Sequence, residues 1–172
     1  NWKFTGVTHE YLEADTHTSR GTLKSLRIND YGDGGSKSEK FTRDIQLLES
    51  GLIDEPNNTR YMFYLANTYK NVGDYQNAIK WYQKRIDAKG WIEEVTCSYE
   101  YMGDCHMKLQ NKDEAVNVWM EGYEYNPSRA ECIYEVIVSL RKDGINTIAY
   151  KLWQIAKNIP YPSNDILFVR ND

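Results

Sequence analysis

The sequence predicts an all-α fold in which a pair of helices is repeated about three times. The first unit, Tyr61 to Ile86, carries apolar residues at helical spacing on two stripes, which a break at Asn71 to Asp74 separates. Two later segments repeat these residue types, because Ala78 recurs as Ala115 and Ala149 at offsets of 37 and 34 residues. One further helix is predicted before the repeats, and a short extended segment is predicted at the N-terminus.

Small residues mark the points where the two helices of a unit approach most closely. In the first unit these are Ala66 and Ala78, and a larger side chain there would force the helices apart. Gly73 lies in the break, where a residue that tolerates positive φ ends the first helix. The later units keep the same order of residue types, with Tyr99, Met102, Gly103, His106, Trp119, Gly122 and Pro127 in the second and Ile133, Val136, Ile137, Leu140, Gly144, Trp153 and Ala156 in the third.

This period is that of tetratricopeptide repeats, and residues 59–161 resemble three of them. The resemblance implies a superhelix of stacked helix pairs. Counting back 34 residues from Ala78 reaches Asp44, which lies in the predicted leading helix of residues 36–58. Because Asp44 stands where the pattern expects alanine, we expect this helix to face solvent or another domain at that point. Such arrays need a polar cap on their last helix. In the C-terminal segment 162–172 two alternatives are open: Ile166, Leu167 and Phe168 supply a lid, or the chain is cut before its natural capping helix.

Residues 1–35 are predicted to form an extended segment. The alternation of apolar and polar residues favours a short strand in Asn1 to Leu12 and a second one in Leu23 to Ile28. The glycine-rich stretch Asn29 to Ser38 leads into the first helix, with Ser36 or Ser38 as its N-cap. A loop of this kind can bind phosphate, but it lacks the Gly-Lys-Ser/Thr ending of a P-loop. We therefore expect an ordinary loop.

Composition excludes several classes of partner and site. The net charge is −4, with 21 basic and 25 acidic residues well mixed, so neither nucleic acid nor an anionic membrane is expected as a partner. No apolar run has the length of a membrane span. Three cysteines without a Cys-x-x-Cys pair argue against a disulfide framework or a zinc site and favour reduced thiols in a cytoplasmic protein. The chain begins with Asn rather than Met, so either its N-terminus was processed or, as we expect, it is a piece of a longer protein.

The front of the chain resembles the C-terminal part of family 2 glycosyltransferases that carry a tetratricopeptide tail. In that family a Trp-x-x-x-Gly-x-x-His-Glu segment closes the nucleotide-sugar domain, and a Gly-containing loop and a Lys-x-x-Arg-Asp helix lead into the repeats. The matching positions here are Trp2, Gly6, His9 and Glu10, then Asp30 to Gly35, then Lys40, Arg43 and Asp44. The chain departs from many relatives, which have His-Tyr-Gly at residues 30–32.

The resemblance implies sugar transfer from a nucleotide sugar by a domain that lies outside this chain. Such an enzyme needs an Asp-x-Asp pair for Mn²⁺ or Mg²⁺, which this chain lacks, so we expect the chain alone to have no cofactor and no catalytic activity. His9 is the candidate metal ligand, and Glu10 is a weaker candidate for a base or for a partner of a metal ligand. The alternative, favoured for the isolated chain, is that His9 and Glu10 are surface residues.

The first helices of the repeats are expected to line a binding groove for a protein, a peptide or a glycan acceptor. In this groove Phe63 and Tyr134 are the predicted anchors, and Asn67 and Arg141 are predicted to orient the ligand. Its acidic members would suit a basic or hydroxyl-rich ligand, although solvated charge is the commoner explanation. The predicted groove residues are Arg60, Phe63, Asn67, Lys70, Cys97, Glu100, Asp104, Met107, Glu131, Tyr134, Val138 and Arg141.

Two functions follow from these patterns. One is an interaction or acceptor-positioning module of a family 2 glycosyltransferase. The alternative is a free-standing scaffold that binds a protein or a peptide. A self-contained enzyme is disfavoured because the sequence offers no nucleophile with its base and no metal cluster.

Overall fold

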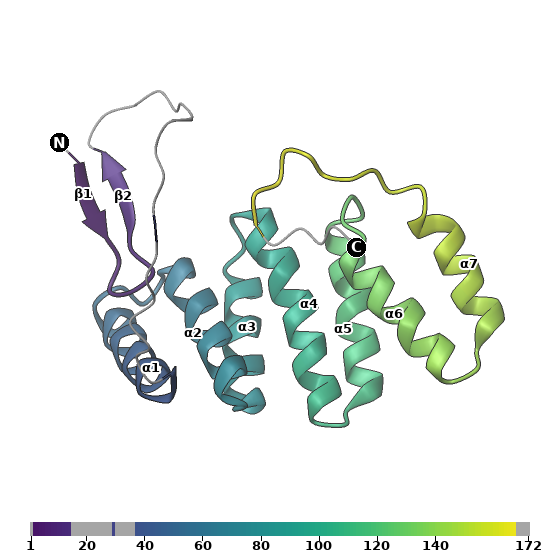
Figure 1. The fold of residues 1–172 in the computed structure, drawn as a ribbon, viewed down its shortest axis with the longest axis horizontal. Helices are drawn as coiled ribbons and strands as arrows, with labels where there is room; N and C mark the ends of the chain where they lie inside the picture. Colours follow the sequence, from purple (N-terminus) through teal and green to yellow (C-terminus); the bar gives the residue numbers. More distant parts are fainter. Residues whose placement is uncertain (1, 15–28, 30–36, 168–172) are drawn as a thin grey trace.

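The computed structural model describes residues 2–14, 29 and 37–167. In these ranges a two-stranded antiparallel hairpin precedes seven α-helices (Figure 1). The elements are β1 (Trp2–Thr5), β2 (Tyr11–Ala14), α1 (Lys37–Asp54), α2 (Thr59–Val72), α3 (Tyr75–Asp87), α4 (Ile92–Lys108), α5 (Lys112–Tyr125), α6 (Glu131–Lys142) and α7 (Asn146–Ala156).

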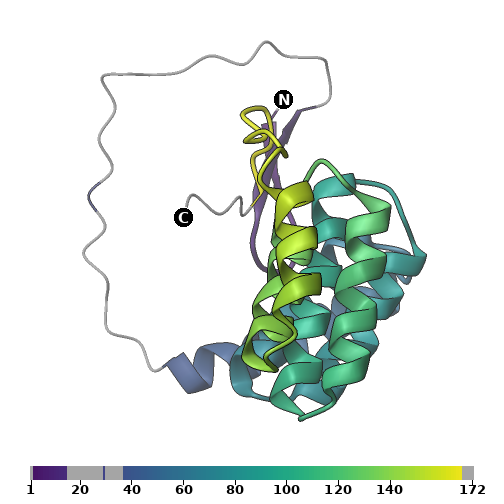
Figure 2. The same cartoon turned by 90° about the vertical axis from the view of Figure 1, so that its right-hand side faces the viewer.

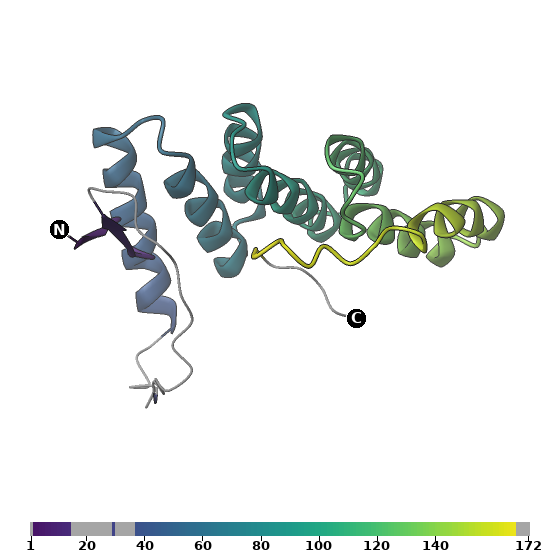
Figure 3. The ribbon, with the colours of Figure 1, turned by 90° about the horizontal axis from the view of Figure 1, so that it is seen from above.

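The helices form the predicted stack of helix pairs. Each helix packs against the helix before it and the helix after it, and α4 also contacts both α2 and α6. The helices α2, α4 and α6 therefore share one side of the array, and we call this side the inner face (Figure 3). This arrangement confirms an all-α, tetratricopeptide-like fold with one helix ahead of the pairs.

The helix ends follow from local chemistry. Gly73 ends α2 with φ 85°, as its place in the predicted break requires. Its neighbour Asp74 caps α3, because its carboxylate accepts a hydrogen bond from the backbone N–H of Asn77 at 3.2 Å. Asn58 caps α2 in the same way through the N–H of Tyr61 at 3.0 Å.

The small residues of the repeat lie where the pattern places them. Ala78, Ala115 and Ala149 are all buried, each at the contact of its helix with the partner helix of the pair. The core is divided into clusters that follow one another along the array, as expected when each unit contacts only its neighbours. Hydrophobic burial therefore holds the pairs together and positions the inner face.

The short strand predicted within Asn1 to Leu12 is present as β1, and it forms a hairpin with a second strand, β2, that the sequence pattern did not separate from it. Trp2 pairs with Ala14 and Thr5 pairs with Tyr11, because the turn contains two residues with positive φ, Gly6 and His9. The hairpin projects beyond the ends of the helices (Figures 1 and 2). The second predicted strand, Leu23 to Ile28, lies outside the described residues.

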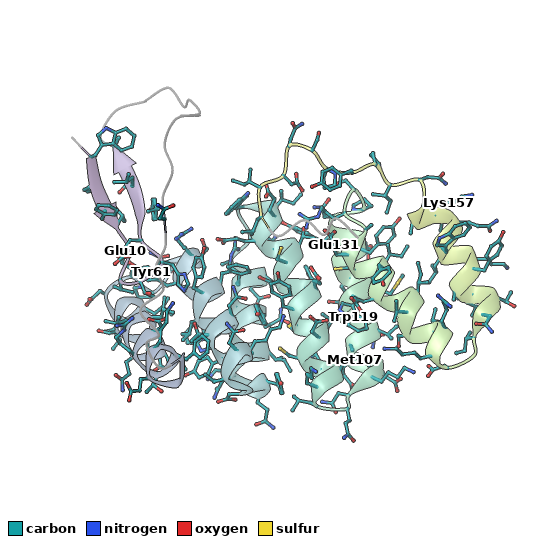
Figure 4. All side chains as sticks on the ribbon, viewed as in Figure 1. Glu10, Tyr61, Met107, Trp119, Glu131 and Lys157 are labelled. Carbon is teal, nitrogen blue, oxygen red and sulfur yellow. The ribbon has the colours of Figure 1, made fainter. Side chains whose placement is uncertain are left out.

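The turn of the hairpin covers α1 and α2. Val7 packs against the cluster that contains Leu48 and Tyr61, and Tyr61 lies at the base of the hairpin near Glu10 (Figure 4). Asp44 is buried with 2% of its surface exposed, and its carboxylate accepts a hydrogen bond from Thr8 Oγ1 at 3.4 Å. The contact explains why Asp44 stands where the repeat pattern expects alanine: at this position α1 contacts the hairpin turn rather than solvent.

The segment after α7, which we call the tail (residues 160–167), does not cover the last helix. It runs back across α6 to α4 (Figures 1 and 3). Leu167 packs against the core cluster of the first two units, and Ile166 is 76% exposed. The expectation that Ile166 and Leu167 form a lid on α7 is therefore wrong, and Phe168 lies outside the described residues. Within the described ranges, none of the helices combines the length and the apolar character that a membrane crossing requires.

Candidate functional site

The inner face carries most of the predicted groove residues, but only some of them are accessible. Tyr134 and Arg141 are exposed on α6, and Arg60, Asn67, Lys70, Asp104, Met107 and Val138 are partly exposed. Phe63, Cys97, Glu100 and Glu131 are buried. The face available to a ligand is therefore narrower and more polar than the sequence pattern predicts.

Phe63 is fully buried, so the prediction that it is an exposed anchor is wrong. Its side chain belongs to the core cluster that joins α2, α3 and α4, together with Tyr82 and Met102. The reason is the direct contact of α2 with α4, which places this position in the seam between the two inner helices rather than in the open groove. The neighbouring Tyr64 is the partly exposed aromatic residue here, with its ring edge-on to Phe63 at 5.6 Å.

The acidic character expected in the middle of the groove is largely neutralised. Glu131 is 6% exposed and accepts two hydrogen bonds from Arg129, at 2.9 Å from Nε and 2.7 Å from Nη2. Asp104 lies 3.4 Å from the ammonium group of Lys70. Paired carboxylates offer little attraction to a basic ligand, so the structure does not favour the basic ligand suggested by the sequence.

Two cavities adjoin on the inner face around Lys70, and we call this part the Lys70 region. The larger, about 400 Å³, lies between the C-terminal turns of α2 and α4 and the C-terminal half of α6, and Met107 and Ser139 are in its wall. The smaller, about 310 Å³, lies between α1 and α2, and His9 and Tyr64 are in its wall. Lys70 and Asn71 line both cavities.

Polar contacts hold the Lys70 region in place. The Lys70 ammonium group lies 3.7 Å from the centre of the Tyr101 ring, a cation–π contact. Asn67 accepts a hydrogen bond from the buried Tyr82 hydroxyl at 2.6 Å. Ser139 is 3% exposed, and its hydroxyl has no hydrogen-bond partner in the described part of the chain. A buried hydroxyl of this kind gains stability when a ligand or a water supplies the missing bond.

His9 closes one end of the smaller cavity. Its ring stacks on Tyr64 with centroids 4.0 Å apart, and its carbonyl oxygen accepts a hydrogen bond from Arg60 at 2.9 Å. Burial lowers the pKa of His9 below its ordinary value of 6.5, although Asp44 acts in the opposite direction. Glu10 is exposed beside it. Within the described ranges, no group of three or more His, Cys, Asp or Glu side chains is arranged to hold a metal ion.

The tail lies on the inner face at the other end of the helices. Arg129 donates a hydrogen bond from Nη1 to the Asp165 carboxylate at 3.1 Å. The carboxylate of Glu93 accepts hydrogen bonds from the backbone N–H groups of Ile166 and Leu167, at 2.9 and 2.8 Å. In Figure 4 Glu131 lies near the end that the tail crosses, whereas Met107 lies toward the opposite end. The inner face therefore has a part covered by the chain itself and a part that is open.

Arg129 is a candidate site residue that the sequence pattern did not reveal. It lies in the connection between α5 and α6 and has 1% of its surface exposed. Burial disfavours its charge, but the hydrogen bonds that it donates to the carboxylates of Glu131 and Asp165 raise the pKa of Arg129 above its ordinary value. The only sequence signal is an Arg two residues before a Glu at a helix start, which carries no period and is common in surface loops.

The three thiols are buried and free. Burial raises the pKa of Cys97 and of Cys105 to about 12, and it raises the pKa of Cys132 well above the ordinary value. Thiols with such pKa values remain protonated at neutral pH and are poor nucleophiles. They act as packing residues in the described structure.

Comparisons with known proteins agree with this geometry. A family model described as tetratricopeptide repeat matches residues 59–89, which hold α2 and α3. The chain has a tetratricopeptide-repeat fold. Similar solved structures include MamA MSR-1 C2, with 22% identity and a TM-score of 0.56 over 72% of this chain and 69% of that chain. Another is MamA AMB-1 P212121, with 20% identity and a TM-score of 0.57 over 76% and 69% of the two chains.

A third similar structure is the MamA RS-1 ArsTM double mutant, with 8% identity and a TM-score of 0.60 over 75% of this chain and 71% of that chain. At such identities the likeness is one of fold. No curated protein sequence matches the chain. Neither the family model nor the similar structures support descent from a glycosyltransferase.

Proposed function

We propose that this chain is a scaffold whose inner face binds an extended segment of a partner protein. The observation that carries this proposal is the Lys70 region, where two adjoining cavities of about 400 and 310 Å³ follow the inner helices. A run of shallow cavities suits alternate side chains of an extended peptide better than one compact small molecule. The polar groups in the wall of the larger cavity include Lys70, Asn71 and Ser139, whose hydroxyl has no hydrogen-bond partner among the described residues.

The scaffold reading has more support than the glycosyltransferase reading. A tetratricopeptide fold supports a protein partner, and the comparisons give no support to a sugar-transfer parent. Acceptor positioning in such a parent, with a nucleotide sugar and Mn²⁺ or Mg²⁺ bound elsewhere, stays a prediction. So do the metal role of His9 and the cytoplasmic location.

The proposal is tested by selecting binding peptides from a random displayed library against the whole chain. The affinities of the selected peptides are then measured for Lys70→Ala and for Met107→Ala, which truncate residues that α2 and α4 contribute to the larger cavity. We expect a loss of about tenfold or more, since one lost anchor of this kind weakens binding by roughly 1.4 kcal/mol. The matched control is Lys80→Ala, which removes an exposed lysine from α3.

Selected peptides that lose no affinity with either inner-face variant would place binding elsewhere and would contradict the proposal. Equal losses of peptide affinity with Lys80→Ala would also contradict the proposal. Circular dichroism of all variants separates a lost contact from a lost fold.

A further inference from the structure

The tail contacts the inner face through three different kinds of interaction within three consecutive residues. The Asp165 carboxylate meets Arg129, the backbone N–H groups of Ile166 and Leu167 meet Glu93, and the Leu167 side chain packs on the core cluster. We call Glu93, Cys97 and Arg129 the tail site. The side chain of Ile166, which lies between the partly buried Asp165 and Leu167, is 76% exposed. Successive side chains of an extended peptide point to opposite sides, so a binding surface on one side contacts every second side chain.

Arg129 in the tail site is held by contacts that do not involve the tail. Arg129 is held by both of its hydrogen bonds to Glu131, so its third nitrogen, Nη1, is aimed outward at the position of the Asp165 carboxylate. A guanidinium group fixed in this way recognises a carboxylate at one defined place. Among the described residues of the tail, the Glu93 carboxylate accepts hydrogen bonds from main-chain N–H groups, so these contacts recognise an extended backbone rather than a particular side chain.

The apolar end of the tail site is equally defined. Leu167 packs beside the cluster that holds Phe63, Val95 and Cys97, and its carbonyl oxygen lies 4.0 Å from the Cys97 sulfur. An aliphatic side chain thus covers the seam between α2 and α4 that would otherwise face water. A carboxylate and an aliphatic side chain two residues later are the two features that the tail site selects.

The tail is also easy to displace. Its carboxylate is 26% exposed, and its contacts are confined to the end of a segment tethered to α7. A tether supplies an effective concentration of about a millimolar, so contacts too weak to hold a free peptide are sufficient to hold the tail. A partner with a better sequence can therefore replace it.

We infer that the tail is an internal occupant of a second peptide site and that its partner is an extended peptide with a carboxylate two residues before an aliphatic side chain. This inference rests on the proposed function and adds to it the class of partner and its regulation. The tail competes with that peptide, so the site is closed until a partner of sufficient affinity is present. The Lys70 region lies at the other end of the inner helices and stays open meanwhile.

The test uses the whole chain and a fluorescent synthetic peptide, Tyr-Pro-Ser-Asn-Asp-Ile-Leu, which is residues 161–167. The double variant Asp165→Asn with Leu167→Ser releases the tail while leaving the helices unchanged. We expect this variant to bind the peptide about tenfold or more tightly than the unaltered chain does, because the competing tethered segment is lost. Ile166→Ser is the matched control, because the Ile166 side chain is exposed. This variant should bind the peptide as weakly as the unaltered chain does.

Altered forms of the peptide test which of its side chains the tail site selects. Asn in place of its Asp, or Ser in place of its Leu, should weaken binding to the released variant about fivefold or more, whereas Ser in place of its Ile should not. Equal binding by the released variant and the unaltered chain would overturn the inference and leave the tail as a structural strap. Equal binding of all three altered peptides would overturn the selectivity.

Two further measurements keep these outcomes clear. If the double variant loses its helical circular dichroism, Asp165→Asn alone is used, and an unchanged affinity in that variant also counts against the inference. Lys70→Ala should not alter binding of this peptide, because it lies outside the tail site. If the synthetic-peptide test fails while the Lys70 region still binds library peptides, the inference about the tail is rejected and the proposed function stands.

Discussion

The indole ring of Trp119 occupies the space in which a side chain at Gly103 would begin. A Cβ atom added to Gly103 would lie 2.2 Å from Trp119 Nε1 and 2.5 Å from Cδ1. The same nitrogen donates a hydrogen bond to the carbonyl oxygen of Glu100 at 3.0 Å. Gly103 and Trp119 thus occupy two positions of the repeat pattern, a small residue on the first helix and a large one on the second. Together these positions form one packing contact between α4 and α5.

Gly103→Ala should therefore destabilise the chain although alanine favours helices. The gain in helix propensity is about 1 kcal/mol, but moving a rigid ring in a packed core costs about 1–3 kcal/mol, and loss of the Trp119 hydrogen bond adds about 1 kcal/mol. A net loss lowers the melting temperature by about 2–4 °C per kcal/mol in a chain of this size. Thermal melting should show no such loss for Gln46→Ala, an exposed control on α1, and an unchanged melt of Gly103→Ala would contradict the packing.

The contact between the helices of a pair gives a second prediction. Ala78 and Ala115 are both fully buried, so Ala78→Leu or Ala115→Phe should overpack the pair and lower the free energy of unfolding by about 1–3 kcal/mol. Ala88→Leu changes an exposed residue at the end of α3 and should stay within about 0.5 kcal/mol. Denaturant unfolding measures all three, and stability losses that do not differ between the buried and exposed sites would sink the repeat register.

A buried ion pair joins α3 to α4. Arg85 is fully buried, contacts Glu94 at 2.9 Å, and donates a further hydrogen bond to the carbonyl oxygen of Lys89 in the connecting loop. Glu94→Ala leaves the guanidinium group buried without its carboxylate, which should cost about 3–5 kcal/mol. Arg85→Met combined with Glu94→Leu should cost clearly less than the sum of the single changes. Additive losses in this double-mutant cycle would mean that the pair does not act as a unit.

The hairpin should dock more weakly in acid. Since burial depresses the pKa of His9 below 6.5, the docked hairpin favours the neutral ring. Its contribution is fully present above the unfolded pKa of about 6.5 and is lost as the pH falls through the lower, folded value. An NMR titration of the His9 ring reports this pKa.

The Tyr64 ring covers one face of the otherwise exposed His9 ring, so Tyr64→Ala should move the His9 pKa back toward 6.5. Tyr134→Ala removes an exposed tyrosine from α6 and should leave the pKa of His9 unchanged. A His9 pKa at or above 6.5 in the unaltered chain would be inconsistent with the docked turn.

The thiols should be unreactive in the folded chain. With the pKa of Cys97 and Cys105 at about 12, only about one thiol in ten thousand is ionised at pH 8. A disulfide reagent should therefore modify all three cysteines rapidly in denaturant and slowly in the native state. Ser50→Cys adds an exposed thiol on α1 and should react at once. Rapid modification of any native cysteine would show that its helix opens locally.

The stack of helix pairs could be predicted from the sequence because its signal is local and periodic. The positions of Ala78, Ala115 and Ala149 follow from the need for small residues where two helices meet, and Gly73 follows from the need for positive φ at a helix end. These requirements act over a few turns of one helix and recur in each unit. Spacing alone was therefore enough for the fold and for the side of the array that lines the inner face.

Only the tertiary structure decided which inner-face residues are accessible and which distant segments cover them. Phe63 and Tyr64 are neighbours in sequence, yet one fills the seam between α2 and α4 and the other lines a cavity. Asp44 lies beneath the hairpin turn, and Arg129 meets a carboxylate 36 residues later in the chain. Contacts of this kind bring together single residues from separate segments, so they have no period in the sequence, and they depend on how each connection directs the chain after a helix has ended.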